Sequence, residues 1–149
     1  MKVRITKLFS FEMAHALLGY DGPCKNIHGH SYRLEITISG EPAGDETNPK
    51  LGMVMDFGDL KKIVKKTVLD DFDHSTVLNE KSDFASVPQI EEIFGNVKLV
   101  SYQPTCENLL IEIRKRILPE LPGNVSLESI RLHETATSFA EIIEADLIK

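Results

Sequence analysis

Residues 24–30, with the sequence CKNIHGH, place one thiol and two imidazoles close together in the chain. Side chains alternate between the two faces of an extended backbone, so His28 and His30 are expected on the same side, with Gly29 leaving room between them. His15, in the sequence FEMAH, becomes a third ligand if the first two strands are neighbours, as consecutive strands usually are. Three histidines with one open position are typical of a catalytic zinc site.

An HxH pair also occurs in proteins that bind no metal, where each histidine makes structural hydrogen bonds. Three of the five histidines fall within residues 15–30 and no CxxC pair competes for zinc, which favours the metal site. Cys24 is open to three interpretations: a fourth ligand that closes a structural site, a neighbouring thiolate that acts as a base, or an ordinary buried cysteine. The loop-like residues on either side disfavour the third, and spacing does not separate the first two.

Further acid and base groups lie later in the chain. Asp73 and His74, in DFDHSTVLN, are candidates for an acid/base pair, although a turn-capping carboxylate beside a surface histidine is the competing interpretation. Glu107 lies in the first turn of an expected helix, where the helix dipole alone favours a carboxylate. Glu134 ends an expected strand, where it is either solvated or placed to accept paired N–H donors from a flat heterocycle.

Hydrophobic periodicity predicts four strands and two helices to position these groups. The expected strands are residues 3–11, 32–39, 125–134 and 139–147, and the expected helices are residues 56–70 and 105–118. Thr105 is the expected N-cap of the second helix. The order strand, strand, helix, helix, strand, strand predicts one α+β domain over residues 1–149, with two helices on one face of a four-stranded antiparallel sheet. Residues 80–103 form a long segment to which the sequence gives no role.

The composition excludes several classes of function. The chain has 149 residues, 42% of them hydrophobic, and a formal net charge of -6, which argues against nucleic acid or an anionic membrane as partner. No stretch has the apolar length of a signal peptide or a membrane span, so we expect a cytoplasmic protein without membrane contact. Its two cysteines are expected to be free thiols.

Six motifs, in order and along nearly the whole chain, resemble the 6-pyruvoyl-tetrahydropterin synthase superfamily: FEMAH, CKNIHGHSY, GMVMDFGDLK, DHSTVLN, PTCEN and HETATSFAE. The short Cys-x-x-x-His-Gly-His spacing resembles the 6-carboxy-tetrahydropterin synthase branch of queuosine biosynthesis, since the pyruvoyl-forming branch usually has a longer gap. The resemblance implies a tunnelling fold, in which the sheets of three subunits join into a barrel and two trimers form a homohexamer. It also implies active sites between subunits.

Carried over motif by motif, the resemblance implies a Zn²⁺ site and an acid/base set. The implied zinc ligands are His15, His28 and His30, the implied proton-abstracting thiolate is Cys24, and the implied partner pair is Asp73 and His74. Glu134 would anchor a pterin ring, with Thr105 and Glu107 lining its pocket.

The implied reaction converts 7,8-dihydroneopterin triphosphate to 6-carboxy-5,6,7,8-tetrahydropterin, acetaldehyde and triphosphate without a redox cofactor. Two alternatives remain at this point. The first is 6-pyruvoyl-tetrahydropterin synthase activity on the same substrate. The second is a non-catalytic, zinc-stabilised binding module in which Cys24 is the fourth ligand.

Overall fold

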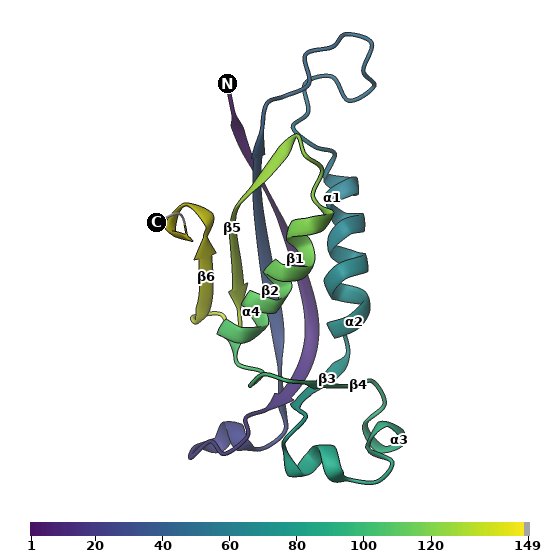
Figure 1. Ribbon diagram of the computed structural model, residues 1–149, viewed down its shortest axis with the longest axis vertical. Coiled ribbons are helices and arrows are strands. Elements are labelled where there is room, and N and C mark those ends of the chain that lie inside the picture. The colour runs from purple at the N-terminus through teal and green to yellow at the C-terminus, as the bar shows by residue number, and fades with distance from the viewer. Residues whose placement is uncertain (148–149) are drawn as a thin grey trace.

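The computed structural model describes residues 1–147 and shows a long twisted sheet with its helices packed on one face (Figure 1). Its strands are β1 (Val3–Ala16), β2 (His28–Gly40), β3 (Ser75–Asn79), β4 (Val97–Val100), β5 (Val125–His133) and β6 (Phe139–Ile143). They lie in the order β4-β3-β1-β2-β5-β6. The pairs β1–β2, β2–β5 and β5–β6 are antiparallel, whereas β3 pairs parallel with the end of β1, and β4 pairs parallel with β3.

Two helical stretches cover the sheet. The first runs through α1 (Phe57–Val64), a π-helical turn (Lys65–Leu69) and α2 (Asp70–Phe72), and the second is α4 (Cys106–Ile117). The Asp56 side chain accepts a hydrogen bond from the Gly58 N–H and so caps α1, while the Thr105 side chain accepts from the Asn108 N–H and caps α4. The remaining helical pieces are α3 (Ile90–Phe94) and short 3-10 turns at Pro23–Lys25, Asp83–Ser86, Leu118–Glu120 and Glu144–Leu147.

Alternation along the strands determines which face of the sheet meets the helices. In β2 the fully buried side chains are Tyr32, Leu34, Ile36 and Ile38. They join the apolar stripe of α4 in one hydrophobic core. The residues between them in β2 point to the opposite, polar face. No helix of the described chain is long and apolar enough to cross a membrane.

The α+β class is confirmed, but the expectation of a four-stranded, wholly antiparallel sheet is wrong, since the sheet has six strands. The sequence signal for β3 is weak because all five of its residues are buried, so the strand shows no alternation, and β4 has only four residues. The expected strand over 139–147 ends at Ile143 and continues as a 3-10 turn. Strand β1 extends further than expected, which places His15 within the strand rather than after it.

Candidate active site

Three histidines meet at one end of the sheet. His15 on β1 is directly opposite His28 on β2 in the antiparallel register, and His30 follows on the same face of β2. A nitrogen atom of each ring lies within 4.8 Å of the other two, and the Nε2 atoms of His15 and His28 are 3.1 Å apart. The structure therefore brings together the three residues for which the sequence predicted a metal site.

Backbone carbonyls fix the orientation of two of these rings. His15 Nδ1 lies 2.6 Å from the Pro104 carbonyl oxygen, and His28 Nδ1 lies 2.8 Å from that of Asn26. A carbonyl can only accept a hydrogen bond, so each Nδ1 carries the proton and each Nε2 keeps its lone pair for a metal. Burial lowers the pKa of His15, which favours the neutral form that a metal requires.

Gly29 permits the close approach of the two strands that carry the histidines. A Cβ atom at this position would lie 3.2 Å from the Met13 carbonyl oxygen, which is tighter than an ordinary van der Waals contact. The glycine therefore serves the packing of β2 against β1, in agreement with the expected close approach between His28 and His30.

A carboxylate borders the three rings. Glu134 immediately follows β5, and its Oε1 lies 3.8 Å from His15 Nε2 and 3.9 Å from His30 Nε2. The hydroxyl of the fully buried Tyr32 donates to the same Oε1 at 3.4 Å, which leaves Oε2 of Glu134 available to another donor. Burial and the nearby Glu134 carboxylate raise the pKa of Tyr32, so this hydroxyl keeps its proton and acts as a donor.

The three residues expected to contact a pterin ring do not behave alike. Glu107 and Glu134 both line a small cavity of about 90 Å³, together with Cys106 and the start of β6. Thr105 is not among the lining residues, and its hydroxyl caps α4. Burial raises the pKa of the Cys106 thiol to about 11, so this cysteine is a neutral wall of the cavity.

Cys24 lies outside the three-histidine group. It occupies the 3-10 turn Pro23–Lys25 in the loop between β1 and β2, where it is half-buried and free of a disulfide. The metal-ligand group found among residues 1–147 consists of His15, His28 and His30 without this thiol. This arrangement favours the interpretation of Cys24 as a neighbouring thiol over that of a fourth ligand.

Asp73 and His74 do face each other, because His74 has a left-handed backbone with φ of 58°. The Asp73 carboxylate lies 2.9 Å from His74 Nδ1 and accepts from the Glu12 N–H at 3.0 Å. The His74 side chain is 78% exposed, so its imidazole is open to a molecule outside the chain. The two side chains therefore lie in contact at the surface, and their role as an acid/base pair stays a prediction.

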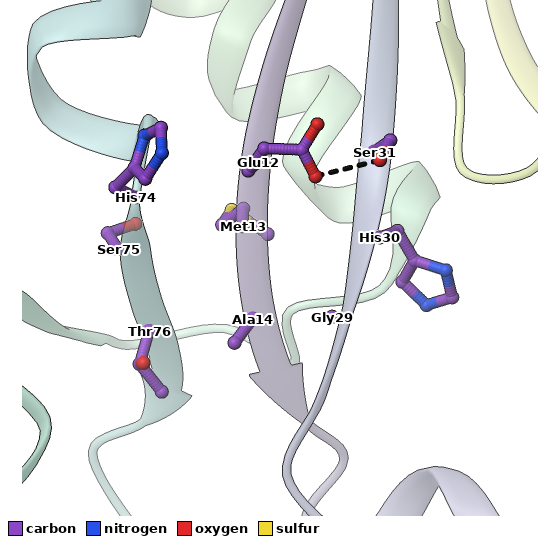
Figure 2. A pocket seen from close by; sticks show the side chains of 9 residues that line it. All are labelled: Glu12, Met13, Ala14, Gly29, His30, Ser31, His74, Ser75 and Thr76. Atoms are coloured by element: carbon purple, nitrogen blue, oxygen red, sulfur yellow. Dashed lines mark hydrogen bonds between the residues drawn. The ribbon is translucent and has the colours of Figure 1, made fainter.

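In one chain His74 directly precedes β3, whereas His28 and His30 are on β2, and β1 lies between these two strands. Figure 2 shows a cavity of about 380 Å³ whose lining includes His74 beside β1 and His30 on β2, with the two imidazoles pointing away from each other. Within one chain the predicted site residues therefore form two separate groups. The first is the three-histidine group with Glu134, and the second is the Asp73–His74 pair.

Some supporting groups gave no usable signal in the sequence. Tyr32 fits the alternating pattern of a core strand, so its contact with Glu134 was not expected. The Pro104 and Asn26 carbonyls belong to the backbone, which carries no residue-type signal. The only sequence feature that marked Pro104 is its position directly before Thr105, the predicted N-cap of α4.

Three imidazoles that converge beside a carboxylate, at the end of the sheet of an α+β domain, have the arrangement of a candidate metal site in an enzyme. The family model of 6-pyruvoyl tetrahydropterin synthase matches residues 4–145. The chain belongs to this family, which confirms the resemblance seen in its motifs.

Individual relatives agree with this assignment. A protein named 6-carboxy-5,6,7,8-tetrahydropterin synthase from Haemophilus influenzae is 39% identical over 143 residues, covering 95% of this chain and 99% of the relative. A protein of the same name from Rickettsia typhi is 36% identical, covering 94% and 99%. The structure of Plasmodium falciparum 6-pyruvoyl tetrahydropterin synthase superposes with a TM-score of 0.68 and 21% identity, covering 95% of this chain and 96% of the other, which supports the fold.

Replacing any one of His15, His28 and His30 by alanine is expected to weaken zinc binding by more than about 100-fold, because each would supply one of three protein ligands. The measurement is the zinc content of each variant after dialysis against a buffered zinc concentration. His74→Ala is the matched control and is expected to keep wild-type zinc, because His74 lies outside the group. Equal zinc loss in all four variants would contradict the assignment of the metal site.

Proposed function

We propose that the protein is a zinc-dependent carbon–oxygen lyase that converts 7,8-dihydroneopterin triphosphate and water to 6-carboxy-5,6,7,8-tetrahydropterin, acetaldehyde and triphosphate, as a cytoplasmic enzyme of queuosine biosynthesis. The observation that carries the proposal is the convergence of His15, His28 and His30 beside the Glu134 carboxylate. The two bacterial relatives that match this chain nearly end to end carry the name of this enzyme.

The donor set fits zinc. Three imidazole nitrogens with an open fourth position suit a catalytic Zn²⁺ ion, and the carbonyl partners of His15 and His28 hold these two rings in place for it. When bound there, zinc would act as a Lewis acid toward the hydroxyl groups of the substrate side chain.

The other site residues would bind the pterin ring and transfer protons. Glu134, held through Oε1 by Tyr32, would accept N–H donors of the pterin ring at its other oxygen and so orient the ring. The Cys24 thiolate would abstract the proton from the substrate side chain, and the Asp73–His74 pair would return a proton from the opposite side. The carboxylate of Asp73 suits this role because it holds the His74 imidazole in one orientation.

A second copy of the chain would bring the two separate groups together. Residues Val3–Phe11 of β1 have no strand partner on one side in the described structure, and β6 forms the opposite edge of the sheet. Because β1 and β6 run in opposite directions, the β6 of one copy can continue the sheet beside the β1 of the next. The register places Ser10, Arg33, His133 and Phe139 in one row, so the neighbour's Glu134 end would lie near Glu12 and His74.

We therefore propose shared active sites in which one chain supplies the three histidines, Cys24 and Glu134, and its neighbour supplies Asp73 and His74. Sheets joined edge to edge in this way close into a barrel of three chains. Two such barrels would form the homohexamer. The exposed apolar side chains Leu8 and Phe139 lie on the two edge strands that would meet.

The zinc-loaded protein, incubated with 7,8-dihydroneopterin triphosphate, is expected to give the 6-carboxy product and acetaldehyde, identified by mass spectrometry. Cys24→Ala should keep its zinc and lose turnover by about 10²–10⁴-fold, the usual contribution of a general base. Tyr20→Phe, a change in the same exposed loop, is the control and should alter neither property. A pyruvoyl product would contradict the proposed reaction, and loss of zinc from Cys24→Ala would make Cys24 a ligand.

Mixing two inactive variants tests the shared site. If Cys24→Ala and His74→Ala chains are unfolded together and reassembled, random assembly should restore about a quarter of wild-type turnover, because about one site in four receives both intact residues from different chains. Each variant reassembled alone is the control. No recovery in mixed hexamers, or a monomer by light scattering, would show that the site is not shared.

A further inference from the structure

The loop of residues 17–27 determines where the Cys24 thiol lies relative to the three histidines. It joins the end of β1, next to His15, to the start of β2 at His28, at the same end of the sheet as β3, β4 and α3 (Figure 1). Within the loop, the Leu17 N–H donates to the Cys24 carbonyl oxygen at 2.9 Å, so the backbone position of Cys24 follows that of Leu17. The stretch around Cys24 is otherwise largely exposed.

Gln103 ties this loop to a distant part of the chain. Its Oε1 accepts from the Leu18 N–H at 3.0 Å, and its Nε2 donates to the Leu18 carbonyl oxygen at 2.8 Å. One side-chain amide thus satisfies both backbone polar groups of one residue, as a neighbouring strand would. Residues 17–27 also form hydrogen bonds among themselves and one with His28 of β2. In the described part of the chain, the two bonds of Gln103 are the only hydrogen bonds between this loop and residues C-terminal to β2. We name this pair of bonds the Gln103 clamp.

The backbone around Gln103 is itself fixed. Its carbonyl oxygen accepts from Asn108 Nδ2 at 3.0 Å and from the Thr105 N–H at 2.8 Å, which fastens it to the start of α4. The next residue, Pro104, is buried and accepts the hydrogen bond from His15 Nδ1. One dipeptide therefore orients a metal-site histidine through its backbone and holds the Cys24 loop through its side chain.

The other end of the loop rests on apolar packing from the same segment. Ile27 and Phe84 pack on a small cluster of buried side chains, separate from the main core, made of Ala16, Leu78, Ile90 and Val97. Phe84, Ile90 and Val97 come from residues 80–103, for which the sequence indicated no role. This packing fixes the entry into β2, and the Gln103 clamp fixes the exit from β1.

We infer that Gln103 is a positioning residue that orders the loop of residues 17–27 and thereby sets the place of the Cys24 thiol against the three-histidine site. The inference rests on the proposed role of Cys24 as the base for its effect on turnover, but its effect on loop order does not. Gln103 contacts neither substrate nor metal in this arrangement, because both polar ends of its side chain are used on Leu18.

The test compares Gln103→Met with wild-type enzyme, both loaded with zinc. Methionine has nearly the length and shape of glutamine without its amide, so the change removes the clamp and keeps the packing. Hydrogen exchange of the peptide that covers residues 17–27 is expected to rise about tenfold or more, since the loop opens more often. Zinc content should stay at the wild-type value, while kcat should fall about tenfold with KM changed by less than about twofold.

Ser101→Ala, an exposed change two residues earlier, is the matched control and should behave as wild type. Unchanged loop exchange in Gln103→Met would overturn the inference, as would faster exchange with wild-type kcat. A drop in zinc content would also overturn it, because it would place the effect at His15. If the wild-type enzyme itself fails to turn over the pterin, the proposed function fails, and the exchange experiment still decides whether the clamp orders the loop.

Discussion

The antiparallel pairing of β1 with β2, in the register that sets His15 opposite His28, is the constraint on which the rest of the structure depends. A shift by one residue would turn either histidine to the other face of the sheet, because strand side chains alternate. The register is fixed by the core, where Phe9, Phe11 and Met13 of β1 share the buried face with Tyr32 and Leu34 of β2. The packing that folds the domain therefore also brings the three histidines together.

The segment before α4 links this site to the helical layer. Its Pro104 carbonyl orients His15, its Thr105 hydroxyl caps α4, and its Gln103 amide holds the loop that carries Cys24. One short stretch thus joins the helix, the three histidines and the thiol, although it lies more than 70 residues from the histidines and the thiol in the sequence. Such coupling makes the relative position of the imidazoles and the thiol a property of the folded core rather than of a flexible loop.

Residue patterns were sufficient to predict the parts of the site that are local in sequence. The HxH pair on a strand with clean alternation indicated two ligands, and the adjacency of the first two strands indicated the third. The sequence patterns did not predict contacts between residues far apart in the chain or contacts made by the backbone. Strand β3 is buried on both sides, so its sequence shows no alternation. The Pro104 carbonyl belongs to the backbone, so no residue type indicates its contact with His15. The Gln103 clamp joins Leu18 to a glutamine in a segment where the sequence predicted no helix or strand. The separation of His74 from His30 also required the folded structure, because it depends on the strand order β3-β1-β2 (Figure 2).

The most direct test of this account is anomalous diffraction at the zinc absorption edge from crystals of the zinc-loaded protein. The account predicts one strong peak per chain, within about 2.0–2.1 Å of the Nε2 atoms of His15, His28 and His30. It also predicts that the Cys24 sulfur is not bound to the zinc and that Asp73 and His74 of a neighbouring chain face the site. A peak bonded to the Cys24 sulfur, or one located away from the three histidines, would contradict it.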